Sequence, residues 1–138
     1  GIEQLKKLDD FNLIRVQNAN KLNKALSNFK NLKLPVIPKN FYHSFYGYAI
    51  LIKDQNKFSR KRLVNHLEKD GIETRAFMGG NLTKQPAYRN EIYRISNNLD
   101  VTDIIEKNAF FIGCHPFIGS NEINRIVKSF ESFFIKEI

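Results

Sequence analysis

Apolar residues recur at alternating steps of three and four positions along the N-terminal part of the chain. The stripe runs from Leu5 to Phe29, with polar interruptions at Asn12 and Arg15, and its spacing predicts a long helix with one mostly apolar face. The interruptions indicate that this helix crosses a polar region or faces a part of the protein outside the chain. Residues 1–3 offer no N-capping side chain, which is what a truncated start would show.

A connector with two prolines separates this helix from a strand. Pro35 and Pro38 end the helical pattern, so we expect residues 34–40 to be extended. Larger and smaller side chains then alternate from Tyr46 to Lys53. This alternation predicts a strand with both faces at least partly covered.

The next helix has signals at both ends. It is expected to span Ser59 to Asp70, with Ser59 as the N-cap. Gly71 followed by Ile72 is typical of a Schellman ending, in which Ile72 packs against Leu67.

Two strands and two helices complete the pattern. Residues 72–77 are expected to form a short strand. A helix capped by Asp100 or Thr102 should then precede a buried strand at residues 110–114, and Ser120 begins a final helix with apolar residues at helical spacing. The order predicts a small α+β domain in which helices cover a short antiparallel or mixed sheet.

The composition limits the classes of function. With 138 residues, of which 42% are hydrophobic, the chain has the size of one folded domain. Lys and Arg number 22 against 14 Asp and Glu, which is compatible with a nucleotide, a phosphate group or a nucleic acid as partner. Because the basic residues are spread through the chain, a solvated basic surface is favoured over a polynucleotide-binding face.

Cysteine usage and hydropathy bear on the compartment. Cys114 is the single cysteine, which excludes an internal disulfide and a zinc site with several thiolates and fits a reducing compartment. No apolar run approaches the ~20 residues needed to span a bilayer, and the N-terminus lacks a signal-peptide pattern. We therefore expect a cytoplasmic protein with no membrane partner.

The residue types that usually carry catalysis are poorly placed. Cys114 and His115 are adjacent, so on a strand they point to opposite faces, and a buried structural cysteine beside a loop histidine is favoured over a nucleophile with its base. His43 and His66 are dispersed, with His66 expected on the exposed face of its helix, and no spacing indicates a metal site. No carboxylate pair lies in a segment expected to be buried, so a binding or accessory domain is favoured over a self-sufficient enzyme.

The segment from Gly79 to Pro86 is the most distinctive candidate site. Two glycines, four polar side chains and a proline lie between apolar segments, a composition typical of a shaped surface loop. The loop and its neighbours offer two cations and several neutral hydrogen-bonding groups, suited to a phosphorylated or polyhydroxylated ligand: Arg75, Asn81, Thr83, Lys84, Gln85 and Tyr88. In the alternative, which the residues leave open, the neutral side chains bond their own backbone in a turn and the two cations point to water.

A family resemblance rests on this loop and the strand before it, Gly80-Asn81-Leu82-Thr83-Lys84-Gln85-Pro86 after Gly71-Ile72-Glu73-Thr74-Arg75. The chain resembles, over essentially its whole length, the C-terminal small domain of the DegT/DnrJ/EryC1/StrS-type sugar-nucleotide enzymes of the aspartate-aminotransferase superfamily, fold type I. The loop favours their nucleotide-linked 4-keto-6-deoxyhexose 3-dehydratases. One departure is Lys84, where the family usually has arginine; lysine keeps the charge but loses the planar fork for a bidentate contact.

The resemblance implies that residues 1–138 are a single C-terminal small domain, with residues 1–30 as the helix that links it to a missing large domain. In the family that large domain holds pyridoxal or pyridoxamine phosphate (PLP or PMP) and the residue that acts on it, a histidine in the 3-dehydratases and a lysine in the aminotransferases. The expected parent is a homodimeric lyase of deoxysugar and lipopolysaccharide O-antigen biosynthesis, with a nucleotide-linked 4-keto-6-deoxyhexose as substrate and the cofactor as electron sink.

By the same resemblance, this domain walls the substrate pocket. Arg75 and Lys84 would face anionic groups, while Asn81, Thr83 and Gln85 would face polar atoms of the sugar or cofactor. The isolated chain is expected to have no catalytic residue, no turnover, no tightly bound cofactor, no metal site and no specific affinity for nucleic acid. The alternatives are the C-terminal domain of a sugar-nucleotide aminotransferase, a basic nucleic-acid-binding module, and a structural domain that completes a dimer.

Overall fold

The computed structural model describes residues 1–54 and 58–136. The helices are α1 (Ile2–Leu5), α2 (Leu8–Leu26), α3 (Arg60–Lys69), α4 (Asp100–Asn108) and α5 (Ser120–Lys136). The strands are β1 (Leu32–Lys33), β2 (Gly47–Ile52), β3 (Thr74–Ala76) and β4 (Ala109–Gly113). Two short 3-10 turns between β3 and α4 span Leu82–Lys84 and Pro86–Tyr88.

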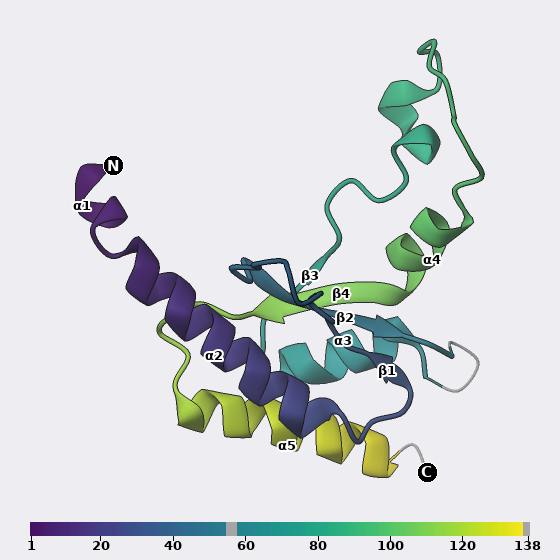
Figure 1. Ribbon diagram of the computed structural model, residues 1–138. Coiled ribbons are helices and arrows are strands. Elements are labelled where there is room, and N and C mark those ends of the chain that lie inside the picture. Colours follow the sequence, from purple (N-terminus) through teal and green to yellow (C-terminus); the bar gives the residue numbers. More distant parts are fainter. Residues whose placement is uncertain (55–57, 137–138) are drawn as a thin grey trace.

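A four-stranded antiparallel sheet is the centre of the fold. The strands lie in the order β1-β2-β4-β3, so that Phe111 of β4 is paired with Ala49 of β2 on one side and with Arg75 of β3 on the other. Helices α2, α3 and α5 lie on one side of the sheet (Figure 1). The α+β class expected from the sequence is confirmed, and every strand pair is antiparallel.

The core lies between the sheet and these three helices. Alternation along the strands turns large apolar side chains toward the helices, and their removal from water stabilises this layer. They come from the sheet and from all three helices, and include Tyr48, Ile50, Ile52, Phe110, Ile112, Leu22, Leu26, Leu63, Leu67 and Phe130. The intervening strand residues Gly47, Ala49 and Phe111 face the other way and are only half-buried. The sheet therefore has a second, partly open face.

The N-terminal helix is divided where the sequence predicts a single helix. α1 ends at Leu5 and α2 begins at Leu8, and α2 stops at Leu26, short of Phe29. The outer part of the apolar stripe is largely exposed, since Leu5 and Leu8 are 66% and 46% exposed whereas Leu26 is fully buried. Packing within the described residues thus supports mainly the C-terminal part of the stripe.

The polar interruption at Arg15 has partners in the chain itself. Nη1 of Arg15 donates to the backbone carbonyls of Phe45 and Tyr46, at 3.2 and 3.3 Å. The helix therefore crosses a polar region made by the segment before β2, which is one of the two explanations expected from the sequence.

Helix α3 follows its sequence signals at one end only. Ser59 occupies the N-cap position, but its side chain makes no capping hydrogen bond, so the predicted side-chain cap is wrong. At the other end, Gly71 has a φ of +75°, and the N–H of Ile72 donates to the carbonyl of Leu67 at 2.9 Å. These are features of the Schellman motif, and the predicted ending is confirmed.

Two further differences concern short elements. Strand β1, Leu32–Lys33, is absent from the sequence prediction because two residues carry no alternation; it exists through its pairing with β2. Helix α4 begins at Asp100 with Leu99 in the N-cap position and without a side-chain cap. Neither Asp100 nor Thr102 therefore caps this helix.

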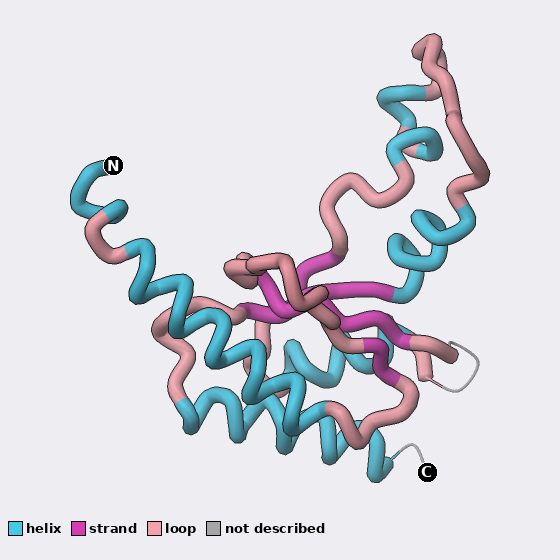
Figure 2. The backbone as a smooth tube through the Cα atoms, in the orientation of Figure 1, coloured by secondary structure: helices cyan, strands magenta, loops and turns pink. Residues whose placement is uncertain are grey.

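Residues 77–99 form a projection that leaves the end of β3 and returns to the start of α4 (Figure 2). Most of its side chains are exposed. It rises on the side of the sheet away from α2, α3 and α5, and the N-terminal end of α2 extends past the sheet at the opposite end (Figure 1). The open face of the sheet thus lies between two projecting parts of the molecule.

Candidate functional site

The open face of the sheet has an aromatic floor. The ring of Phe111 covers Gly47, since a Cβ atom at Gly47 would lie 2.5 Å from that ring. Tyr46 and Phe77 flank it, with ring centroids 6.2 and 6.1 Å from that of Phe111. An aromatic surface of this kind suits a planar ring or the apolar face of a ligand.

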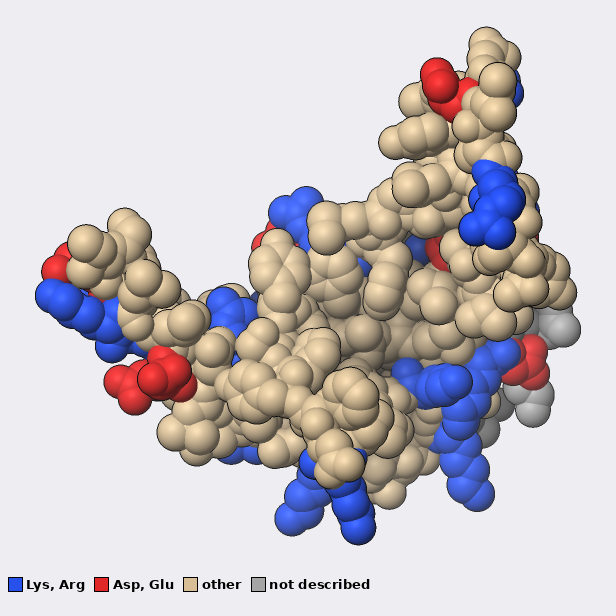
Figure 3. All heavy atoms as spheres, turned by 45° about the horizontal axis from the view of Figure 1, so that its top comes forward, with Lys and Arg blue, Asp and Glu red and all other residues tan. Residues whose placement is uncertain are grey.

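A mainly apolar hollow of about 270 Å³ lies on this floor. Tyr46 and Phe111 line it together with Phe77 and Met78, the first residues of the projection. In the space-filling view, the surface between the two projecting parts is hollowed and mainly uncharged, with Lys and Arg toward its edges (Figure 3). The hollow is thus a place for an uncharged part of a ligand.

A second hollow, of about 280 Å³, shares Tyr46 and Phe111 with the first and carries charge. Arg75, a site residue expected from the sequence, lines it together with Arg15 and His115. The Arg75 guanidinium is paired with the Glu73 carboxylate, and both side chains are largely exposed. Two cations beside one carboxylate make this hollow the part of the face best suited to an anionic group.

The position of Tyr46 depends on an unusual turn. Phe45 is buried and has a φ of +51°, in the left-handed region that bulky residues rarely adopt. Its N–H donates to Nδ1 of His43 at 3.0 Å, and its carbonyl accepts from Arg15. These contacts hold the turn so that Tyr46, which is 77% exposed, contacts the edge of the floor.

Cys114 lies beneath this face and has a structural role. It is 1% exposed, and its Sγ donates to the backbone carbonyl of Arg15 at 3.3 Å. Burial raises the pKa of the thiol to about 11, so the thiol stays protonated at neutral pH. His115 is exposed. The expected buried cysteine beside a loop histidine is confirmed.

The Gly79 loop, residues 79–85, is closed by its own hydrogen bonds. Its two glycines have φ of +72° and +53°, so the chain reverses where glycine fits without strain. Oδ1 of Asn81 accepts from the N–H of Thr83 at 3.1 Å and from its Oγ1 at 2.7 Å. Nε2 of Gln85 donates to the carbonyl of Gly79 at 3.0 Å. These bonds account for the amide and hydroxyl side chains in the loop sequence.

Two carboxylates of α4 fasten this loop to the domain. Oδ1 of Asp103 accepts from Nδ2 of Asn81 at 2.7 Å, and Oδ2 accepts from Nζ of Lys84 at 2.6 Å. Oε2 of Glu106 accepts from the N–H of Asn81 at 2.9 Å. Because Asn81 is 2% exposed, its polar groups are satisfied inside the protein rather than by water.

These bonds also set the charges at the loop. The hydrogen bond from Asn81, followed by that from Lys84, holds the pKa of Asp103 below its ordinary value. The hydrogen bond to Asp103 in turn raises the pKa of Lys84. Lys84 is therefore an ammonium group with a carboxylate partner at neutral pH.

The six residues expected from the sequence lie in three places. Arg75 lines the open face, and Tyr88 is 43% exposed in the second 3-10 turn. The other four belong to the loop fastened to α4 and line neither hollow. The structure thus separates the sheet cation from the polar loop.

The sequence pattern alone singles out neither the aromatic floor nor the carboxylates of α4. Phe111 could have been found from strand alternation, because its neighbours on both sides point into the core. Asp103 and Glu106 stand three residues apart on one face of a helix, a spacing compatible with a shared partner. That partner, Asn81, lies 22 residues before Asp103, and no sequence spacing identifies it.

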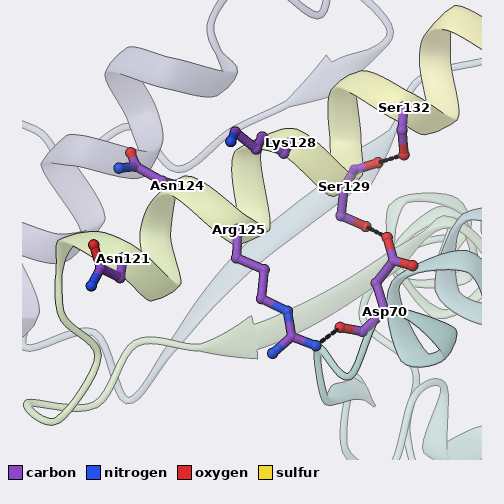
Figure 4. A pocket seen from close by; sticks show the side chains of 7 residues that line it. All are labelled: Asp70, Asn121, Asn124, Arg125, Lys128, Ser129 and Ser132. Carbon is purple, nitrogen blue, oxygen red and sulfur yellow. Dashed lines mark hydrogen bonds between the residues drawn. The ribbon is translucent and has the colours of Figure 1, made fainter.

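A wide polar groove of about 700 Å³ lies along α5 beside the end of α3 (Figure 4). Oγ of Ser129 donates to the Asp70 carboxylate at 2.6 Å, and Arg125 donates to the Asp70 backbone carbonyl. Nearby, Nε2 of His66 lies 2.9 Å from Oγ of Ser132. The expectation that His66 is on an exposed helix face is wrong, because α5 packs against that face. None of the six expected site residues lines this groove.

Within residues 1–54 and 58–136, no group of three or more His, Cys, Asp and Glu side chains is arranged to hold a metal ion. Nor does any helix in them combine the length and apolar character of a membrane span.

Residues 1–131 match the DegT/DnrJ/EryC1/StrS aminotransferase family. Over 136 residues, the chain is 36% identical to a dTDP-4-dehydro-2,6-dideoxy-D-glucose 3-dehydratase of Saccharopolyspora spinosa, a match that covers 99% of this chain and 29% of that protein. The chain thus spans about a third of the length of the curated relatives it matches.

Solved structures share the fold. An E. coli GDP-4-keto-6-deoxy-D-mannose 3-dehydratase with bound hydrated PLP matches with a TM-score of 0.83 and 31% identity, over 94% of this chain and 33% of that one. An aminotransferase from Psychrobacter cryohalolentis matches with a TM-score of 0.86 and 20% identity, over 99% of this chain and 37% of that one. The second match shows the fold alone.

Proposed function

Because the chain belongs to the DegT/DnrJ/EryC1/StrS aminotransferase family, we propose that it is the C-terminal small domain of a longer sugar-nucleotide 3-dehydratase. The enzyme uses PMP or PLP and removes the C3 hydroxyl of a nucleotide-linked 4-keto-6-deoxyhexose. It acts in the cytoplasm, in the synthesis of deoxysugars such as those of lipopolysaccharide O-antigens.

The observation that carries this proposal is a difference in sequence identity. The S. spinosa and E. coli dehydratases are 36% and 31% identical to the chain, whereas the P. cryohalolentis aminotransferase is 20% identical at a similar TM-score. A shared fold does not distinguish one chemistry from another, so the higher identity favours the dehydratase. The second candidate is the C-terminal domain of an aminotransferase of the same family.

The open face suits one wall of such a pocket. Phe111 with its flanking rings offers a surface for a planar ring or a sugar, and Arg75 lies beside it for an anionic group. When bound, PMP supplies the electron sink that allows the C3 hydroxyl to leave. The residues of this chain bind and orient the ligand and exclude water from one side of it, with Tyr88 and the Gly79 loop as a second wall.

We assign no catalytic residue to this chain. Lys84 is an ammonium group paired with Asp103, and Cys114 is a buried thiol with a raised pKa, so neither suits the role of nucleophile or base. The residue that acts on the cofactor belongs to the large domain, as a histidine in a dehydratase or a lysine in an aminotransferase.

The complete enzyme is proposed to be a homodimer. The projection carries apolar side chains that water covers in the single chain, among them Met78 at 83% and Ile92 at 104% exposure. Apolar groups gathered on one segment are typical of surfaces that another domain or subunit covers.

The proposal is tested by product analysis with the complete enzyme, supplied with PMP and with dTDP- or GDP-linked 4-keto-6-deoxyhexoses. Mass spectrometry is expected to show a sugar nucleotide that has lost the C3 oxygen and gained no nitrogen. An amino sugar would instead establish the second candidate. Absence of both products with either nucleotide would contradict the family-based proposal.

Substitutions in the same enzyme test the proposed walls. Arg75→Gln is expected to raise the KM for the sugar nucleotide about tenfold, because it removes a charge-assisted hydrogen bond. Lys128→Gln, which removes a cation from the polar groove on α5, is the matched control and should leave KM unchanged. If Asn81→Ala and Lys84→Ala both leave turnover and affinity unchanged, the loop is not part of the pocket.

A further inference from the structure

The Gly79 loop begins where the apolar hollow ends. Phe77 and Met78 line that hollow, and the two glycines of the loop follow them directly. The next residue, Asn81, is bonded to α4 through both Asp103 and Glu106. The attachment to α4 therefore fixes the direction in which the chain leaves the open face.

We propose that Asp103 and Glu106 are positioning residues, which hold the Gly79 loop against α4 and thereby place Lys84 and Met78 relative to the sugar nucleotide. Neither carboxylate touches the ligand; both act through residues of the loop. This role rests on the proposed function, because it requires a ligand against the open face.

Asp103 uses its two oxygens on two different loop residues. One oxygen accepts from Asn81 at 2.7 Å and the other from Lys84 at 2.6 Å. An asparagine at this position has a donating NH2 group in place of one of these oxygens, so it cannot accept at both positions. Asp103→Asn thus releases one anchor of the loop at nearly constant side-chain volume.

Glu106 occupies space that a glycine leaves open. A Cβ atom on Gly80 would lie 2.7 Å from Cδ of Glu106, so the carboxylate packs directly on the loop backbone. It also accepts the N–H of Asn81, which is buried and would lack that acceptor after Glu106→Ala. Glu106→Gln keeps an oxygen acceptor at the same place and should restore the contact.

Backbone hydrogen exchange of the complete enzyme tests the attachment without relying on the reaction. Asp103→Asn and Glu106→Ala are expected to speed the exchange of residues 81–85 about tenfold, and Glu106→Gln should not. Asp100→Asn is the matched control, because Asp100 lies on the same helix and accepts from Asn98 instead of the loop. Unchanged exchange in both Asp103→Asn and Glu106→Ala overturns the proposal.

Steady-state kinetics test the positioning role. Asp103→Asn is expected to raise KM for the sugar nucleotide about tenfold and to change kcat by no more than about twofold. The reason is that a misplaced loop weakens binding of the ground state and of the transition state equally. In combination with Lys84→Gln, the effects on KM should be less than additive, because Asp103 acts through Lys84.

Faster exchange with an unchanged KM, or fully additive effects, overturns the positioning role and leaves the proposed function intact. An amino-sugar product overturns only the proposed function, since the KM of that reaction still reports on Asp103.

Discussion

Gly80 combines two constraints at one position. Its φ of +53° lies in the left-handed region, which costs a residue with a side chain about 1–2 kcal/mol. A Cβ atom there would also lie 2.7 Å from Cδ and 2.8 Å from Cγ of Glu106. The carboxylate would have to move, and its hydrogen bond to Asn81 would lengthen or break.

Gly80→Ala is therefore expected to lower the free energy of unfolding of the chain by about 2 kcal/mol, measured by urea denaturation. Gly113→Ala is the matched control. Gly113 has no left-handed φ, and its Cβ would meet Ile118 at 3.5 Å, an ordinary contact, so its effect should stay within about 0.5 kcal/mol. Equal losses in the two variants would contradict the role assigned to Gly80.

The contact between the Gly79 loop and α4 depends on the charges of Asp103 and Lys84. Because the pKa of Asp103 is lowered, its contribution is present at and above the ordinary carboxyl range and is lost as the pH falls through the lowered pKa. Because the pKa of Lys84 is raised, its contribution is complete below the ordinary lysine range and is lost as the pH rises through the raised pKa. The pair is thus retained throughout the neutral range.

An acid titration followed by NMR is expected to show this directly. The side-chain amide of Asn81 should change its chemical shift at a pH below the ordinary carboxyl range, because Nδ2 donates to Asp103. Asp103→Asn should abolish that change, while Asp100→Asn should retain it. If the chemical shift of Asn81 in the unsubstituted chain instead changes within the ordinary carboxyl range, the loop does not stabilise the Asp103 carboxylate.

For the molecule as a whole, apolar side chains are exposed on both sides of the open face. On the N-terminal helices, Leu5 and Leu13 are 66% and 56% exposed, and on the projection Ile92 and Ile95 are 104% and 52% exposed. Exposure on this scale is typical of surfaces that bind another domain or subunit. It supports the proposal that the chain supplies one wall of a larger pocket.

The isolated chain is accordingly expected to retain neither PLP nor PMP after dialysis and to show no turnover, because a single wall offers few of the contacts that bury a cofactor. The measurement is the absorption band of the bound cofactor, with the complete enzyme as positive control. A band retained by the isolated chain would contradict the proposal. The chain should also show no salt-sensitive binding to DNA or RNA, which a nucleic-acid-binding module would show.

Local backbone effects follow the sequence prediction more closely than side-chain contacts do. Gly71 acts on its own backbone, and the ending of α3 is where the sequence indicates it. The side-chain cap expected at Ser59 depends on a rotamer, and it does not form. The sequence pattern places His66 toward water, but the side chain faces α5, because the sequence cannot distinguish an exposed helix face from a polar face that a neighbouring helix covers.

Apart from the break between α1 and α2, the sequence accounts for the helices, the longer strands and the reversal at Gly79, since these depend on dihedral preferences and on residues within a few positions of one another. Packing alone determined which distant residues meet. Phe111 lies beside Ala49 and Arg75 because β4 is inserted between β2 and β3. Asn81, Asp103 and Glu106 meet because α4 returns the chain to the sheet at β4. Side-chain partners so far apart in the sequence are set by the fold of the whole chain, so the sequence pattern of a single segment cannot predict them.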